Sequence, residues 1–518
     1  MTSSFMGIET AKRSLFTQTA ALNTTGHNIS NANTAGYSRQ IVNMTAARPM
    51  EYPGMQRSNT PGQIGTGVEF QSITRVRQAF LDDQFRNQNK SLGSWEVQAS
   101  TLDKLQSIVN EPSESGLRTV MDNFWKSWSD LSKDPENVTG RKIVRENAMA
   151  LTDAFNQMSK QLNDFNNDLT SNIRVKVNEI NSTISTISNL NVEIQRVEGL
   201  GNDANDLRDQ RDLLTDNLSK IANISVTNTP QGYNISMGNV SLVSGATANP
   251  TTMEDLSAAY GNGDGTGDLN DGEVFGMFVS QKKYVADYMN QLDTLANTLA
   301  NGNLSVTIPA GSVLPTGSVF DGVDYSGVVS SDIAVNVAGL NGLYKLGYSF
   351  ETPAQSGREF FTSTNGPITA SSIQLNPELA ADSGLIATSL RTTGTGTNEV
   401  AVKGNNTMAL LMANLKDTKF SFTSSTNGVQ SGTIDDYFQS FVGQLGVQGQ
   451  EAQRQYDNQQ NLVQQVDGNR QSVSGVSLDE EMSNLIKFQH AYGAASRFMT
   501  TYDQILDKLI NGTGQVGR

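Results

Sequence analysis

The chain has 518 residues, a formal net charge of −15, two histidines and no cysteine. Because a single hydrophobic core stops growing at about 250–300 residues, this length predicts several domains. The acidic balance disfavours nucleic acid and anionic membranes as partners. The lack of cysteine excludes disulfides, thiolate catalysis and cysteine-based metal centres, and we expect no cofactor.

Residues 5–31 have the pattern of an amphipathic helix. Spacings of three and four residues alternate along one face, which is typical of a heptad seam, although polar residues interrupt it. The seam consists of Ile8, Ala11, Leu15, Gln18, Leu22, Thr25 and Ile29. The run 28–37 is rich in Asn, Ser and Gly, and it predicts the end of the helix.

The N-terminal residues do not resemble a Sec signal peptide, because they lack an apolar core of about 7–15 residues. No run of about 18 apolar residues predicts a membrane-spanning helix. Residues 1–80 contain more basic than acidic side chains, so the acidic charge is concentrated in the remainder. We therefore expect the ends and the middle of the chain to face different surroundings.

The C-terminal segment mirrors the first helix. Ser477 and Glu480 form a capping-box pattern that predicts a helix start, and two apolar stripes follow side by side. The first stripe is Phe488, Ala491, Ala495, Phe498, Tyr502, Ile505 and Leu509, and the second is Leu478, Met482, Leu485, Tyr492, Met499 and Leu506. One partner helix cannot cover a face this wide.

We interpret the two terminal helices as parts of a coiled coil or bundle between subunits. The alternative is that they pack only on each other within a monomer. Under the first interpretation, the assembly interface comprises Ile8, Leu15, Leu22, Ile29, Phe488, Ala495, Phe498, Tyr502, Ile505 and Leu509. An antiparallel pair with Ile8 opposite Leu509 would also bring His27 to His490, and would create a pH-sensitive contact.

The middle of the chain changes character several times. Alternating residues predict strands at 40–44 and 67–73, and a hairpin at 224–243. Spacings of three and four predict helices in between and afterwards, at 77–86, 94–110, 117–133, 139–165, 166–222, 273–300 and 434–470. Residues 301–430 are rich in Val, Thr, Ser and Gly, which favours an inserted all-β domain.

The expected fold is therefore multidomain α+β, with paired terminal helices. Residues 1–75 and 474–518 would form a helical coiled-coil assembly domain. Residues 76–300 and 431–473 would form a mainly helical domain that carries the hairpin. Residues 301–430 would form the β-rich insertion.

One stretch resembles a metal loop. Residues 262–273 place oxygen-bearing side chains near the spacing of an EF-hand, and calcium prefers such ligands. The weak calcium candidates are Asn262, Asp264, Thr266, Asp268 and Glu273. Position one is Asn rather than Asp, and an ordinary solvated turn explains the same residues, so we expect no metal.

Enzyme signatures are missing from the sequence: it contains no P-loop, nucleophile elbow, dinucleotide fingerprint or zinc-protease motif. The remaining catalytic alternative is a secreted carboxylate hydrolase. It would use acids of the insertion such as Asp321, Asp324, Glu351 or Asp382. Acidic residues in a β-rich region more often face solvent, and we expect no enzyme.

The run that follows the first helix has the pattern NIxNxxTxGYxR. Its motif residues are Asn28, Ile29, Asn31, Thr34, Gly36, Tyr37 and Arg39. This run and the last helix resemble the ends of the flagellar axial family of rod, hook and hook-associated proteins. Segments 62–86, 111–137, 207–226 (with RDQRD), 231–245 and 292–303 are similar, in order, to the hook–filament junction members of that family.

This resemblance implies a structural adaptor that joins the flagellar hook to the filament. Its partners would be further copies of itself in a helical ring, the hook protein, and a second junction protein on the flagellin side. A flagellar export chaperone would hold the C-terminal helix before type III export, and the site of action would be extracellular. A hook or rod axial protein is the alternative within the family.

Overall fold

The computed structural model describes residues 5–48, 65–111, 113, 116–422 and 428–512. They form two compact units, each built from separate stretches of the chain. The first contains residues 1–94, 175–275 and 457–518, and the second contains residues 95–174 and 276–456. Four of the described helices contribute residues to both units: α2 (Ala79–Val109), α4 (Val138–Gly199), α7 (Glu273–Val279) and α12 (Ile434–Ser474).

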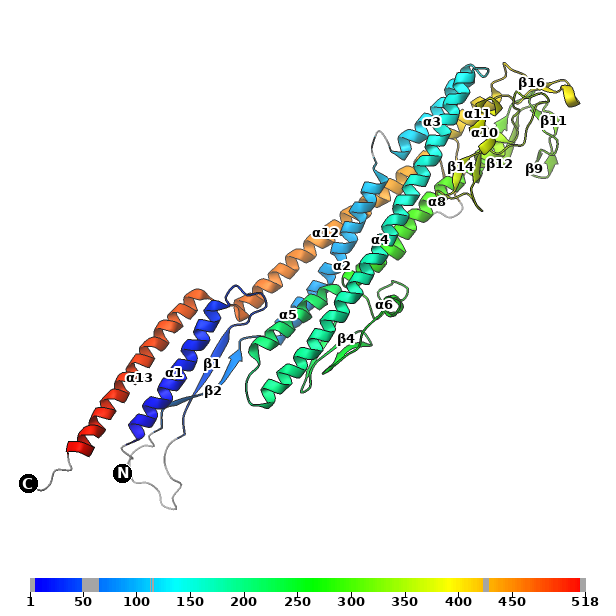
Figure 1. Ribbon diagram of the computed structural model, residues 1–518. Coiled ribbons are helices and arrows are strands. Elements are labelled where there is room, and N and C mark those ends of the chain that lie inside the picture. The colour runs from blue at the N-terminus through cyan, green and yellow to red at the C-terminus, as the bar shows by residue number, and fades with distance from the viewer. Residues whose placement is uncertain (1–4, 49–64, 112, 114–115, 423–427, 513–518) are drawn as a thin grey trace, which may run out of the picture. The chain divides into compact units, whose positions relative to one another are not determined.

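The first unit contains both terminal helices, α1 (Met6–Ser30) and α13 (Leu478–Gly512), which lie side by side in Figure 1. A two-stranded antiparallel sheet packs on α1; it pairs β1 (Gln40–Ala46) with β2 (Val68–Arg75). The two terminal helices and both strands are present as predicted, and the helices pair within one chain. The bundle between subunits stays a prediction.

The rest of the first unit includes α5 (Asn205–Ile221), a small sheet and short helices. The predicted hairpin is present within a four-stranded antiparallel sheet, in which each strand pairs with the next one in sequence. The sheet and the helices that follow it are β3 (Ser225–Thr229), β4 (Gly232–Met237), β5 (Val240–Ser244), β6 (Thr247–Ala248), α6 (Met253–Tyr260) and α7 (Glu273–Val279).

The second unit has one continuous hydrophobic core that joins its helices to the inserted region. Its helices are α3 (Leu117–Lys133), a π-helical turn at Ser280–Val285, α8 (Ala286–Asn301), α9 (Gly339–Tyr344), α10 (Pro377–Ala381) and α11 (Thr407–Asn414). Short 3₁₀ turns occupy Ser383–Leu385, Gly396–Asn398 and Leu415–Asp417.

The strands of the second unit are short. A four-stranded sheet has the order β12 (Ile333–Ala338), β7 (Asn303–Ile308), β17 (Phe420–Ser421), β18 (Ser431–Gly432). Small two-stranded ribbons pair β8 (Val313–Leu314) with β11 (Gly327–Val328), β9 (Val319–Phe320) with β10 (Val323–Asp324), β13 (Phe361–Ser363) with β14 (Ile373–Leu375), and β15 (Thr392–Thr393) with β16 (Val400–Ala401).

The insertion therefore differs from the expected all-β domain. It contains the short helices α9, α10 and α11, and its core continues into α3 and α8. Strands of two or three residues bury too little surface to form a stable sheet alone, so helices complete the core. The boundaries of the two compact units differ from those of the three expected domains, and the three-domain division stays a prediction.

Phe360 is the best test of this shared core. Its side chain is fully buried, and its ring centroid lies 5.0 Å from that of Tyr344 and 5.6 Å from that of Trp128. We expect Phe360→Ala to lower the free energy of unfolding of the second unit by ~4 kcal/mol, because the cavity adds to the lost burial.

The measurement is urea unfolding followed by tryptophan fluorescence, because Trp95, Trp125 and Trp128 all belong to the second unit. Val328→Ala is the matched control, since this side chain is 74% exposed. Equal stability of the two variants would contradict a shared core.

Candidate assembly surface

The side chain of Asn28, near the end of α1, is the centre of the motif. Its Oδ1 accepts hydrogen bonds from the backbone N–H of Gln40 (3.0 Å) and from the hydroxyl of Tyr37 (2.8 Å). Its Nδ2 donates to the Gln40 carbonyl (2.8 Å) and to Oε2 of Glu481 (3.1 Å). All four bonding positions of the buried amide are therefore used, and they connect α1, β1 and α13.

The other motif residues shape the loop between α1 and β1. Thr34 donates its hydroxyl to Oδ1 of Asn31 (3.2 Å), and the Asn31 amide donates to the carbonyl of His27. Gly36 has a φ of +78°, and a Cβ there would lie 2.9 Å from Cβ of Leu213 on α5. Glycine suits this position for both reasons.

Tyr37 of the motif is partly buried and lies near several carboxylates. Burial raises the pKa of Tyr37, and the nearby carboxylates of Asp206, Asp209 and Glu481 raise it further. The hydroxyl therefore stays protonated and remains a hydrogen-bond donor to Asn28.

The last motif residue, Arg39, fastens the loop to the C-terminal helix. Its Nη1 lies 2.6 Å from Oε2 of Glu480, and its backbone N–H donates to the carbonyl of Ser474 at the end of α12. The motif thus joins α1 and β1 to both C-terminal helices, which are more than 430 residues away in sequence.

Two contacts establish the register of the terminal pair. Asn28 bonds to Glu481 at one end, and Gly7 faces the ring of Tyr502 at the other end, so the helices are antiparallel. This register differs by eight residues from the predicted one, which placed Ile8 opposite Leu509.

The predicted meeting of His27 with His490 is therefore wrong. His27 instead lies near Tyr37 (Nδ1 to the hydroxyl, 3.0 Å) and Asp206 (Nε2 to Oδ2, 3.5 Å). His490 is exposed on α13, nine positions beyond Glu481. Nine residues of α-helix span about 13 Å, which is too far for the two imidazoles to meet.

The structure divides the predicted interface residues into two groups. Those that lie at the seam or beside it are buried or half-buried: Ile8, Leu15, Leu22, Ile29, Phe488, Ala495 and Tyr502. Those on the outer surface of α13 are Phe498 (43% exposed), Ile505 (52%) and Leu509 (54%). The monomer thus uses the first group in its own packing and presents the second group to solvent.

The seam on α13 also separates two exposed apolar flanks. Phe498 and Ile505 lie seven residues apart on one side of the seam. Met482, 51% exposed, follows Glu481 on the other side of the seam, and Ile486, also 51% exposed, lies further around the helix, away from α1. Helix α1 covers only the middle of the apolar face, as its predicted width implied.

A buried ionic network connects the motif loop to α5 of the first unit. Asp209 accepts the backbone N–H of Ser38 (2.9 Å) and, like Asp212, bonds to Arg75 (2.6 and 2.9 Å). Further along α5, Asp216 binds both Arg86 (2.8 Å) and Arg470 (2.5 Å).

The charges in this network have opposite effects on two neighbouring carboxylates. Burial raises the pKa of Asp209. Burial also opposes ionisation of Asp212, but the guanidiniums of Arg77 and Arg75 outweigh it, so the pKa of Asp212 is lowered. Sequence patterns did not reveal this network, because its partners lie 130 or more residues apart; the RDQRD run was the only signal.

The structure does not bring the calcium candidates together. Glu273 bonds to Lys176 (2.7 Å), and Asp268 accepts hydrogen bonds from Asn239. Asp264 accepts from its neighbour Thr266. Among the described residues, no group of three or more histidines or acids could hold a metal ion.

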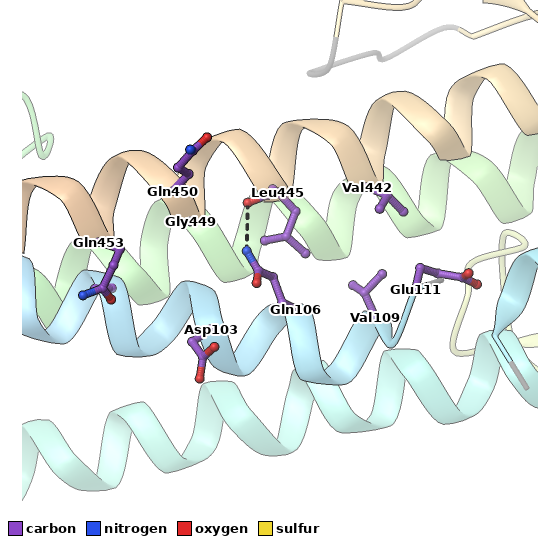
Figure 2. Close-up of a pocket in the computed structure, with 11 residues that line it drawn as sticks. Asp103, Gln106, Val109, Glu111, Val442, Leu445, Gly449, Gln450 and Gln453 are labelled. Carbon is purple, nitrogen blue, oxygen red and sulfur yellow. Dashed lines mark hydrogen bonds between the residues drawn. The ribbon is translucent and has the colours of Figure 1, made fainter. Parts of the chain in front are cut away.

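A groove of about 550 Å³ in the second unit was not anticipated by any motif. It runs between α2 and α12, and Figure 2 shows Gln106 reaching from α2 to the carbonyl of Leu445 on α12 (3.5 Å). Val109, Val442, Asp103, Glu111 and several amide side chains line it.

No described helix is both long enough and apolar enough to cross a membrane.

Comparisons with known proteins agree with the C-terminal helix and the helical region in the middle of the chain. Residues 102–303 match a family model described as the flagellar hook-associated protein FlgK helical domain. Residues 471–512 match one described as the flagellar basal body rod FlgEFG protein C-terminal. Together with the paired termini, these matches define a flagellar axial protein.

The relatives specify the family. Flagellar hook-associated protein 1 of Bacillus subtilis (strain 168) is 33% identical, and the alignment covers 100% of both chains. The protein of the same name in Escherichia coli (strain K12) is 28% identical over 97% of this chain and 99% of its own length. The chain belongs to the flagellar hook-associated protein 1 family and is a structural component of the bacterial flagellum.

A solved structure shares the fold. The flagellar hook junction protein FlgK from Burkholderia pseudomallei gives a TM-score of 0.52 at 14% identity, covering 76% of this chain and all of that one.

Replacing the central amide tests the motif. We expect Asn28→Asp to weaken the docking of α13 by ~3 kcal/mol, because a donor is lost and a second carboxylate is buried beside Glu481. Hydrogen exchange of residues 478–512 would report the loosening. Asn23→Asp, at an exposed position of the same helix, is the control; similar protection in both variants would contradict the role of Asn28.

The ionic network offers an independent test. Asp212→Asn leaves the buried guanidiniums of Arg75 and Arg77 without a full counter-charge, so we expect a loss of ~3 kcal/mol in the stability of the first unit. Thermal unfolding measured by far-ultraviolet circular dichroism, with the exposed Asp503→Asn as control, would detect it. An Asp212→Asn protein as stable as the control would argue against the network.

Proposed function

We propose that this protein is the junction that joins the flagellar hook to the filament, and that its terminal helices carry the assembly. The observation that supports this proposal most directly is the unequal covering of α13. Its seam is occupied by α1, whereas Phe498, Ile505, Met482 and Ile486 remain more than 40% exposed on the two flanks.

Exposed apolar side chains on both sides of a paired helix need more than one neighbour. Copies of the same chain can supply those neighbours through head-to-tail contacts, which propagate as a helix or a ring. Each side chain that leaves water would contribute about 1.5–3 kcal/mol when fully buried. Several such contacts per subunit favour assembly without a new binding site.

The remaining partners follow from the family. The hook protein would lie below the ring, and a second junction protein would lie above it on the flagellin side. The chain would leave the cell through the type III export apparatus, with a chaperone on the C-terminal helix beforehand. A chain without cysteine suits this route, because it cannot form crosslinks while it is unfolded.

A hook or rod axial protein is the second candidate within the class. The match of residues 102–303 to the hook-associated helical domain favours the junction role over this candidate.

The acids named for a hydrolase have local structural partners. Glu351 bonds to Arg358 (2.6 Å), Asp324 accepts from Ser326, and Asp382 accepts from the N–H of Gly384. Asp321 accepts from Asn336. A structural role without catalysis is therefore part of the proposal.

The decisive experiment replaces an exposed flank residue in a strain that lacks the native protein. Ile505→Asp places a charge where a neighbour would bury an isoleucine, and the position tolerates it in the monomer because the side chain is 52% exposed. We expect cells with hooks but with about tenfold fewer filaments, and flagellin in the medium.

Gln504→Asp is the matched control, because it adds the same charge at the adjacent exposed position. Filament counts from electron microscopy and flagellin in culture supernatants give the readout. Normal filaments on cells with Ile505→Asp would refute the proposed role of this flank.

A further inference from the structure

We propose that two small contacts, Asn28 with Glu481 and Gly7 with Tyr502, select one of two competing registers of the terminal helices. The competing register is the one that apolar residues alone would favour. In this proposal a polar contact and a steric fit determine the register, although burial of apolar side chains alone would favour the other one.

The competing register is visible in the sequence. On α1, large apolar residues recur every seven positions, at Ile8, Leu15, Leu22 and Ile29. On α13, the same spacing gives Leu509, Tyr502, Ala495 and Phe488. Sliding α13 by eight residues from its observed position would align all four pairs, and burial of apolar surface favours such an alignment.

The structure uses a neighbouring column of α1 instead. The two contacts begin and end a column of α1 with the same seven-residue spacing, whose residues are smaller or polar, and regular helix geometry carries this column along α13 between them. This column is Gly7, Ser14, Ala21 and Asn28, and it lies opposite Tyr502, Ala495, Phe488 and Glu481. Gly7 and Ala21 thus lie opposite the large residues Tyr502 and Phe488, whereas Ser14 lies opposite the small Ala495.

Each contact opposes the slip for a different reason. Glu481 is 2% exposed, and in the competing register its carboxylate would lose the Asn28 donor. A buried charge without a donor costs more than a lost surface contact. At the other end, a Cβ on residue 7 would overlap the ring of Tyr502 where it now lies, so a larger residue would have to displace this ring.

A single buried polar residue can specify the register of a coiled coil at some cost in stability. The Asn28–Glu481 contact has this form, and Arg39 adds an ion pair with the adjacent Glu480 (2.6 Å). An eight-residue slip would move the flanks of α13 by about 12 Å relative to α1 and the motif loop. The register therefore determines where a subunit presents its exposed side chains.

The test uses the full-length chain, whose lack of cysteine makes engineered crosslinks unambiguous. Ser14→Cys with Ala495→Cys reports the observed register. Leu22→Cys with Ala495→Cys reports the competing one. Each pair is oxidised in the parent protein and in the double variant Gly7→Leu/Glu481→Leu, and crosslinked chains are quantified by peptide mass spectrometry.

In the parent, we expect the Ser14–Ala495 crosslink to dominate. In the double variant, we expect the ratio of the two crosslinks to move toward Leu22–Ala495 by about tenfold or more. Glu481→Gln, which keeps an acceptor for Asn28 and adds no clash, should retain the parent ratio.

Two outcomes would overturn the proposal. Persistence of the Ser14–Ala495 crosslink as the main product in the double variant would mean that the apolar seam alone sets the register. Loss of both crosslinks would mean that the two contacts hold the helices together rather than choose their register. The single variant Glu481→Leu, measured in parallel, keeps the comparison valid should Gly7→Leu disturb α1 itself.

Discussion

The buried amide of Asn28 is the constraint on which the terminal part of the protein depends. An asparagine side chain has two donors and two accepting positions, and here all four are used within 3.1 Å. Its partners come from the loop, from β1 and from α13. Because burial makes an unmade hydrogen bond costly, these three segments are held in one arrangement. The other residues of the N-terminal motif support this arrangement around Asn28.

The ionic network extends this arrangement into the rest of the first unit. Asp209 bonds both to the loop, through Ser38, and to the end of β2, through Arg75. The same helix continues to Asp216, which binds Arg470 of α12. Buried ion pairs contribute little net stability compared with apolar packing, but a mismatched pair is very costly. The ion pairs therefore determine the positions of segments more than the stability of the unit: they align the loop, the sheet and α12 with α5.

The sequence predicted the elements of this protein better than their contacts. Helix 117–133 and the strand at 40–44 were found because periodicity is a local property. The register of α1 on α13 was missed, because large apolar residues favour another pairing than the one in which Asn28 meets Glu481 and Gly7 meets Tyr502. The helices of the insertion were missed because each spans only five to eight residues. The ionic network joins residues too distant for any spacing rule.

The register also explains why the apolar face of α13 is wider than the part of it that α1 covers. If the large residues of α1 faced α13 directly, Leu15 and Leu22 would cover more of that face, and less would remain for neighbours. The small column of α1 covers only the seam and leaves Phe498 and Ile505 exposed. A monomer that packs its own helices incompletely keeps apolar surface available for assembly, while polar contacts at one end keep that surface in a defined place.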